Sequence, residues 1–154
     1  MPSKVCLVTG ASYGLGSHIA KQLGMNNLSW QIDSRVISAQ KGWEVVLVAR
    51  STDKLEQVKH EIVTAGGAAL AAPCDITDKE SVEQLKQKLE TSYPQVHKLM
   101  VKLWTFSMTN VQGVECVINN AAYVPPLHTF VEGDVEQWEK CVGVNVWGAL
   151  HVTR

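Results

Sequence analysis

The feature that most constrains the fold is a glycine-rich run placed directly after a short apolar segment. Residues 5–8 are all apolar, and residues 9–16, Thr-Gly-Ala-Ser-Tyr-Gly-Leu-Gly, contain three glycines. Glycine lets a turn approach a phosphate without a Cβ clash, and the N-terminus of a following helix attracts an anion. The pattern therefore predicts a buried strand, a phosphate-binding turn and a helix, which together indicate a dinucleotide-binding unit.

Strand-like and helix-like segments alternate along the rest of the chain. Short apolar runs predict strands over residues 4–9, 45–49, 68–74 and 115–118, and each is followed by a segment with apolar residues at helical spacing. Such alternation favours a parallel sheet with helices on both faces. The predicted fold class is therefore α/β, with a Rossmann-type doubly wound sheet.

Polar residues and glycines mark where several helices begin and end. A helix that begins near Ser51 is expected to end at residues 66–67, where two glycines form a C-cap. Thr77 and Glu80 have the spacing of a capping box for the next helix. The last helix is predicted to begin near Asp134. It carries one apolar stripe, formed by Val135, Trp138, Val142, Val146 and Ala149.

Two stretches do not fit this alternation and are predicted to be insertions, at about residues 25–40 and 98–114. Arg50 follows Gly16 by 34 residues, whereas the cofactor contact after the second strand normally comes about 20 residues after the glycines. Both insertions fall in helix-to-strand connections, away from the strand carboxyl ends where ligands bind. We therefore expect a single domain over residues 1–154 whose site tolerates both insertions.

Composition argues against several classes of function. A formal net charge of −1 gives no basic patch for nucleic acid or for an anionic membrane. The four cysteines have no metal-binding spacing, so we expect buried free thiols in a reducing, cytoplasmic compartment and no metal site. The sequence contains no apolar segment long enough to span a bilayer.

Four motifs occur along the chain in a recognisable order. They are the T-G-x-x-x-G-x-G spacing of residues 9–16, Asp75 after the third predicted strand, Asn-Asn-Ala-Ala at residues 119–122, and Asn145 in the last helix. Together they resemble the short-chain dehydrogenase/reductase family, over the whole chain apart from the two insertions. Ala122 stands where this family usually has glycine, a small departure because it adds only a methyl group.

The resemblance implies both a strand order and a cofactor site. The family sheet has the order 3-2-1-4-5-6-7, so this chain is expected to form the incomplete order 3-2-1-4. Asp75 would accept a hydrogen bond from the adenine amine. The residues implied to hold the cofactor are Gly10, Ser12, Tyr13, Gly14, Leu15, Gly16, Asp75, Ile76, Asn119, Asn120, Ala121 and Ala122. Taken singly, Asp75 could be an ordinary strand-end carboxylate, and residues 119–120 a plain turn.

The residues after the second predicted strand bear on the choice of cofactor. An acidic side chain there would bind a ribose 2′-hydroxyl and repel a 2′-phosphate. This chain has Arg50 and Ser51 instead. A guanidinium binds a phosphate through two hydrogen bonds, and the serine hydroxyl adds another. NADP(H) is therefore favoured over NAD(H), the alternative being that Arg50 is a solvated loop charge.

The proton-transfer residues of the family are a serine and a Tyr-x-x-x-Lys pair, with Asn145 in a supporting role. None of Tyr13, Tyr93 and Tyr123 is followed by lysine four residues later. The resemblance therefore implies an NADP(H)-dependent oxidoreductase that interconverts a small-molecule carbonyl and a secondary alcohol by hydride transfer. We expect the chain to be an N-terminal part of it, inactive alone. The alternatives are a non-catalytic nucleotide-binding or dimerising module and a non-functional splice product.

An incomplete sheet has weak points that can be predicted. The fourth strand would be an open edge, and the last helix would lack packing partners, so we expect marginal stability or self-association of the isolated chain. The resemblance implies that the complete enzyme has further strands and is a homo-oligomer.

Overall fold

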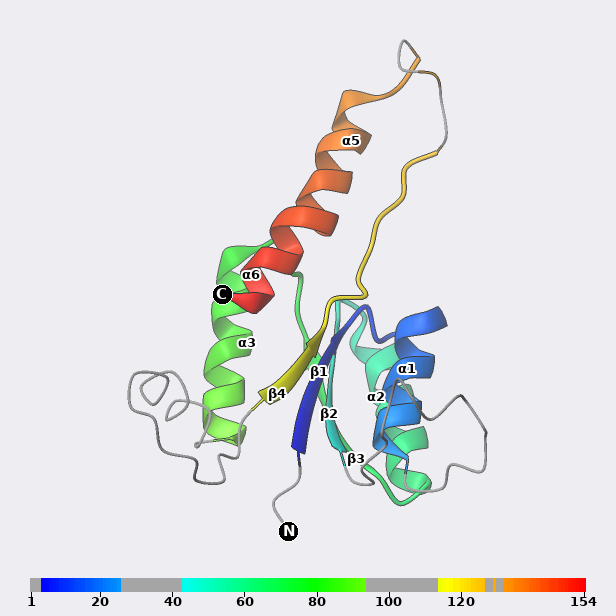
Figure 1. The fold of residues 1–154 in the computed structure, drawn as a ribbon, viewed down its shortest axis with the longest axis vertical. Coiled ribbons are helices and arrows are strands. Elements are labelled where there is room, and N and C mark those ends of the chain that lie inside the picture. Colours follow the sequence, from blue (N-terminus) through cyan, green and yellow to red (C-terminus); the bar gives the residue numbers. More distant parts are fainter. Residues whose placement is uncertain (1–3, 26–42, 94–113, 127–128, 130–131) are drawn as a thin grey trace.

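Four parallel strands form one sheet in the order β3-β2-β1-β4 (Figure 1). The order is the one that the family resemblance implies, and the α/β fold class is confirmed. The strands are β1 (Lys4–Thr9), β2 (Trp43–Ala49), β3 (Ala68–Pro73) and β4 (Val114–Ile118). The computed structural model describes residues 4–25, 43–93, 114–126, 129 and 132–154.

The two central strands are buried because both of their faces are apolar. Val8 in β1 and Leu47 in β2 have no exposed surface, and they are register partners in the sheet. Helices α1 (Gly14–Gly24) and α2 (Thr52–Thr64) cover one face, and α3 (Lys79–Ser92) covers the other (Figure 1). The core therefore lies on both sides of β1 and β2, as the doubly wound prediction requires.

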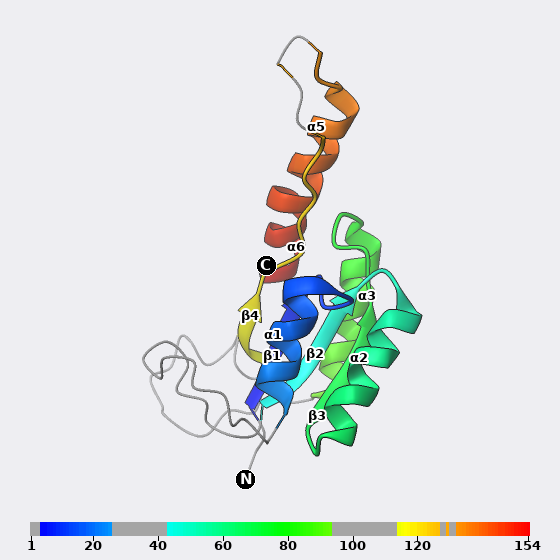
Figure 2. The same ribbon diagram turned by 90° about the vertical axis from the view of Figure 1, so that its right-hand side faces the viewer.

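The last helix consists of three consecutive segments and extends beyond the sheet (Figures 1 and 2). The segments are α5 (Val135–Val142), the π-helical η1 (Gly143–Gly148) and α6 (Ala149–Thr153). The α6 end lies beside α3. The predicted apolar stripe does not form one buried face: Val135 is 60% exposed, and Val142 and Val146 are each 47% exposed. The π-helical segment interrupts the regular spacing, and much of the helix stands away from the sheet.

The capping box predicted for α3 is wrong. Asp78 caps this helix, because its carboxylate accepts hydrogen bonds from Glu80 N at 3.2 Å and from Ser81 N at 3.1 Å. The Thr77 hydroxyl instead donates to Asp75 at 2.7 Å. Both Thr77 and Asp78 are suitable N-cap residues, and the contact with Asp75 takes Thr77 away from the helix end.

Two other helix boundaries follow the predicted signals. The N–H of Gly67 bonds back to the Ile62 carbonyl at 2.9 Å beyond the end of α2, and Gly66 has φ +81°. Helix α5 begins after Asp134, whose side chain accepts a hydrogen bond from Glu136 N at 2.9 Å. In both cases the deciding contacts are local, so the sequence contains all the information needed.

All four cysteines are free, as predicted, but they differ in burial. Cys6 and Cys74 are buried, whereas Cys116 and Cys141 are only partly buried. Burial, together with the neighbouring Cys116 thiol, raises the pKa of Cys6 to about 12. The prediction of buried thiols therefore holds for two of the four residues.

The edge expected at the fourth strand is present. In the described part of the sheet β4 pairs with β1 and has no second neighbour. Glu115 and Val117 are exposed along it. The two predicted insertions, at about residues 25–40 and 98–114, lie almost wholly outside the described residues. Among the described helices, none is both long enough and apolar enough to cross a membrane.

Replacing Asp78 with alanine should lower the free energy of unfolding by about 1 kcal/mol, because two N–H groups at the start of α3 lose their acceptor. Asp78→Asn should keep most of the stability, since an asparagine oxygen also caps a helix. Chemical denaturation followed by circular dichroism measures both. A Thr77→Ala variant that loses more stability than Asp78→Ala would show that Thr77, and not Asp78, caps the helix.

Candidate functional site

A cleft of about 520 Å³ opens where the carboxyl ends of the four strands meet. Gly10, Arg50, Asp75 and Ala121, which follow the four strands, surround this one cavity. Sheets of this type bind ligands at that edge. Nine predicted cofactor residues line the cleft: Gly10, Ser12, Tyr13, Arg50, Ser51, Asp75, Ile76, Ala121 and Ala122.

The turn after β1 has glycine where a side chain could not fit. Gly10 has φ +68°, and a Cβ built there would lie 2.8 Å from the Asn120 side-chain nitrogen. A Cβ at Gly16 would collide with the same amide. Gly14 has φ +58° but faces open space, so only its backbone conformation favours glycine. The glycines therefore allow the turn to pack closely against Asn120 while its backbone stays at the cleft.

A buried threonine ties this turn to the end of β4. Thr9 is 1% exposed, and its hydroxyl oxygen accepts hydrogen bonds from the backbone N–H groups of Asn120 and Ala121, each at 3.0 Å. The hydroxyl also donates to the Ile118 carbonyl at 3.4 Å. Thr9 is not among the predicted site residues. The available signal is its position, as a polar residue between an apolar strand and the glycine turn.

The Asn120 side chain completes the contact between the turn and β4. Its amide nitrogen donates to the carbonyls of Thr9 at 3.1 Å and Gly10 at 3.4 Å. Asn120 therefore holds the turn in place from outside the cleft lining. Four other predicted residues also lie outside that lining: Gly14, Leu15, Gly16 and Asn119.

Asp75 is oriented by the residue two positions later. Its Oδ1 accepts hydrogen bonds from the Thr77 backbone N–H at 3.0 Å and from the Thr77 hydroxyl at 2.7 Å. Burial by itself would raise the pKa of Asp75, but these two hydrogen bonds and the charge of Arg50 together hold the pKa below its ordinary value. The carboxylate therefore stays ionised and can accept a hydrogen bond at the cleft wall.

Positive charge gathers where β2 meets α2. Arg50 is exposed and lines the cleft, as does Ser51, the N-cap residue of α2. The Ser51 side chain makes no capping hydrogen bond. Lys54 also lines the cleft, and its ammonium nitrogen lies 5.6 Å from the centroid of the Tyr13 ring. The sequence alone does not single out Lys54, because many helices carry lysine on a solvent-facing side.

The last helix reaches the cleft through Lys140 and Val144, neither of which was predicted. The Lys140 ammonium lies 4.5 Å from the centroid of the Tyr123 ring. Asn145 in η1 pairs with the Tyr123 backbone on both sides, accepting from its N–H at 2.8 Å and donating to its carbonyl at 2.9 Å. Asn145 therefore positions Tyr123 and does not itself line the cleft.

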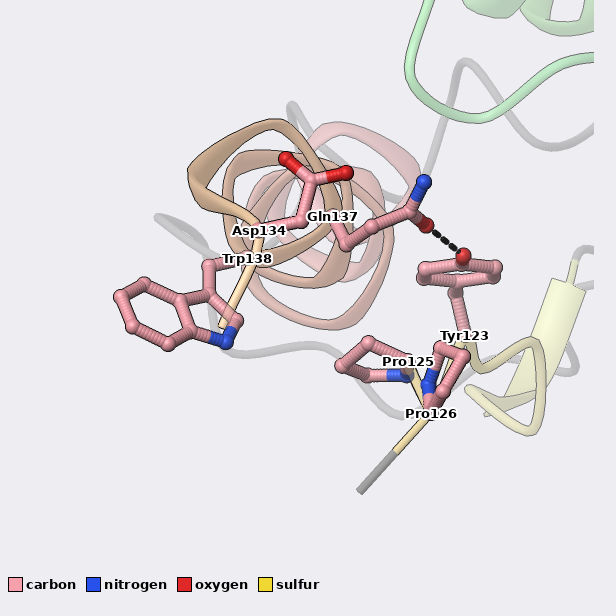
Figure 3. A pocket seen from close by; sticks show the side chains of 6 residues that line it. All are labelled: Tyr123, Pro125, Pro126, Asp134, Gln137 and Trp138. Carbon is pink, nitrogen blue, oxygen red and sulfur yellow. Dashed lines mark hydrogen bonds between the residues drawn. The ribbon is translucent and has the colours of Figure 1, made fainter. Parts of the chain in front are cut away.

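A second cavity of about 390 Å³ lies between the segment after β4 and helix α5 (Figure 3). The Tyr123 hydroxyl donates to the side-chain oxygen of Gln137 across it. Tyr123 lines both cavities, so the two share a wall. The lining of the second cavity is Tyr123, Pro125, Pro126, Asp134, Gln137 and Trp138.

The charged groups at the cleft are three cations and one carboxylate. They are Arg50, Lys54, Lys140 and Asp75. Across the described ranges, no group of three or more His, Cys, Asp or Glu side chains is placed to hold a metal ion. The balance of charge suits an anionic ligand that also offers a hydrogen-bond donor to Asp75.

One known protein family matches most of the chain. The short chain dehydrogenase family matches residues 34–154. The chain belongs to this family. The matched residues run from before β2 to the end of the last helix, so β1 and the glycine turn precede the match. The family is one of oxidoreductases.

The relatives and solved structures below match 77% or more of this chain, and the chain spans about half of their length or less. A fatty acyl-CoA reductase from Acinetobacter baylyi is 39% identical over 118 residues, covering 77% of this chain and 29% of that protein. An alcohol dehydrogenase from Thermococcus sibiricus, solved with 5-hydroxy-NADP, is 25% identical with a TM-score of 0.71. The match covers 97% of this chain and 50% of that one. A 3-ketoacyl-(acyl-carrier-protein) reductase from Brucella melitensis, solved with NADH, is 26% identical with a TM-score of 0.69. The match covers 98% of this chain and 47% of that one.

Replacing Thr9 with valine should lower the free energy of unfolding by about 2 kcal/mol, because two backbone N–H groups lose their acceptor in a buried place. Thr9→Ser keeps the hydroxyl and removes one methyl group, so it should cost less than about 1 kcal/mol. Denaturant titrations of the two variants measure the difference. Equal losses would contradict this expectation, because the methyl group would then contribute as much to stability as the hydroxyl.

Proposed function

We propose that this chain is the cofactor-binding part of an NADP(H)-dependent oxidoreductase that interconverts a carbonyl group and a secondary alcohol. The observation that carries the proposal is the cleft at the strand ends, where the glycine turn, Asp75 and Arg50 meet. A nicotinamide dinucleotide, when bound, supplies the hydride chemistry. The residues of this chain bind and orient it.

The groups at the cleft fit the parts of a dinucleotide. The turn at Gly10, Ser12 and Tyr13 brings peptide backbone to the cleft, which suits the pyrophosphate. Asp75 would accept from the adenine amine through Oδ2, since both of the described hydrogen bonds to its carboxylate are accepted by Oδ1. Ile76, Ala121 and Ala122 offer apolar wall beside it. The remaining predicted cofactor residues lie outside the cleft lining and would act from beside it: Gly14, Leu15, Gly16, Asn119 and Asn120.

The choice of NADP(H) over NAD(H) rests on the residues after β2. Family membership leaves this choice open, because one solved relative holds an NADP derivative and another holds NADH. Arg50 and Ser51 follow β2 directly, where an acidic residue would favour NAD(H). The Ser51 hydroxyl is not used to cap α2, so it is available to a phosphate oxygen.

The proposal extends to activity: this chain alone binds the cofactor but does not turn over substrate. None of its tyrosines has a lysine four residues later. Tyr123 lines the cleft, but its hydroxyl is donated to Gln137. Asn145 would keep its supporting role by holding the Tyr123 backbone.

The proposed enzyme is cytoplasmic and, when complete, a homo-oligomer. Four free cysteines are typical of a reducing compartment. The last helix exposes apolar side chains that a second copy could cover. These are Val135, Val142, Val146, Trp147 and Leu150.

Purified chain should bind NADPH more tightly than NADH, and Arg50→Gln should remove most of that preference. Loss of a bidentate contact to a phosphate should weaken NADPH binding about tenfold. NADH affinity should change less than about twofold, because it has no 2′-phosphate for Arg50 to contact. Isothermal titration calorimetry with each dinucleotide measures both constants.

Arg50→Lys is the matched control for this comparison. It keeps the charge but loses the fork of hydrogen bonds, so its NADPH affinity should fall between those of the wild type and Arg50→Gln. Equal binding of NADPH and NADH by the wild type would contradict the cofactor assignment. Binding of neither dinucleotide would contradict the proposed function and favour a non-functional product.

Incubation of the chain with NADPH and a panel of ketones should give no loss of absorbance of the reduced nicotinamide. The expected result is binding without turnover, because this chain has no Tyr-x-x-x-Lys pair to exchange the substrate proton. The same sample should be shown to bind NADPH. Formation of an alcohol in step with NADPH consumption would overturn the claim that the chain alone is inactive.

A further inference from the structure

Lys54 connects two walls of the cleft that lie far apart in the sequence. It belongs to the first turn of α2, and its ammonium nitrogen lies 5.6 Å from the centroid of the Tyr13 ring in the glycine turn. Both residues line the cleft, and the Tyr13 side chain is 71% exposed. A cation over an aromatic face is attracted by the ring quadrupole. The ring therefore favours a position of the Lys54 ammonium at the cleft.

The charges near Lys54 show why a second cation is useful there. Arg50 lines the same cleft, but its charge acts partly on Asp75, whose pKa it helps to lower. A ribose 2′-phosphate carries close to two negative charges, about −1.5 to −2 at neutral pH. Because the Arg50 guanidinium also interacts with the Asp75 carboxylate, it would neutralise only part of the charge of the 2′-phosphate.

Lys54 is available for this role because no described carboxylate is paired with it. The next lysine of the same helix, Lys59, is paired with a carboxylate: its Nζ lies 3.0 Å from Glu56 Oε2. Lys59 also lies outside the cleft lining. Both lysines carry one positive charge and belong to α2, so Lys59 serves as the matched control for a substitution of Lys54.

We propose that Lys54, positioned by the ring of Tyr13, binds the 2′-phosphate together with Arg50 and so helps to determine the preference for NADP(H). This inference rests on the proposed function, because it assigns a further residue to the same cofactor site. Tyr13 acts as a positioning residue, through Lys54 and not through a charge of its own.

The first experiment compares Lys54→Gln with Lys59→Gln in the full chain by calorimetric titration of NADPH and NADH. Lys54→Gln should weaken NADPH binding about fivefold and leave NADH binding within about twofold, as expected for one exposed charge. Lys59→Gln should leave both affinities unchanged. The NADPH effect of Lys54→Gln should shrink at high salt, because the contact is between charged groups near the surface.

The second experiment tests the role of the Tyr13 ring. Tyr13→Phe keeps the ring and should leave NADPH affinity unchanged, whereas Tyr13→Leu removes it and should lower NADPH affinity by about twofold. Combined with Lys54→Gln, Tyr13→Leu should add little further loss, because both changes remove the same contact. Additive losses in the double variant would show that Tyr13 does not act through Lys54.

The outcomes separate this inference from the proposed function. Failure of the wild type to bind either dinucleotide would overturn the proposed function itself. Tight NADPH binding that depends on Arg50 but is unchanged in Lys54→Gln would overturn only the role of Lys54. A loss of NADPH and NADH affinity by equal factors in Lys54→Gln would also overturn it, because the 2′-phosphate could then not be the group that Lys54 binds.

Discussion

The site depends on one hydrogen-bonded contact between the ends of β1 and β4. The Thr9 hydroxyl oxygen accepts hydrogen bonds from the backbone N–H groups of Asn120 and Ala121. The Asn120 side-chain amide donates to the carbonyls of Thr9 and Gly10. Residues 111 positions apart are joined in this way. Because β1 and β4 are neighbours in a parallel sheet, their carboxyl ends already meet at one edge, and the contact then sets where the glycine turn lies relative to the cleft.

The electrostatics of the cleft follow from where the chain leaves each strand. Asp75 follows β3 and is kept ionised by Thr77 and Arg50, so it presents an acceptor instead of a neutral acid. Arg50 follows β2, and Lys140 comes from the last helix. An anionic ligand in the cleft would therefore lie between Arg50 and Lys140, which come from different elements. It would also have to offer a hydrogen-bond donor to the Asp75 carboxylate. Such a pattern selects for a phosphorylated molecule that also carries an amine or hydroxyl.

The strands could be predicted from the sequence because strands buried on both faces are continuous apolar runs. β1 matches the prediction, and β2 begins two residues earlier than predicted because the charged Glu44 separates Trp43 from the apolar run. Motif residues such as Gly10 and Asp75 lie at the cleft because strand ends place them there. The α3 cap was missed because two adjacent residues could fill it. Lys54 was missed because the packing of α2 against the sheet determines which side of this helix faces the cleft, and the sequence alone does not show that side.

The last helix shows how one polar side chain can link a projecting element to the site. An asparagine amide presents a donor and an acceptor side by side, as a peptide group does, so Asn145 can pair with both the N–H and the carbonyl of Tyr123. It thereby takes the place of a neighbouring strand for the segment that continues beyond β4. Asn145 lies within the π-helical η1, a type of segment that often occurs at functional sites. Because Lys140 and Val144 belong to the same continuous helix, this pairing fixes the distance of the helix from Tyr123 and with it the far wall of the cleft.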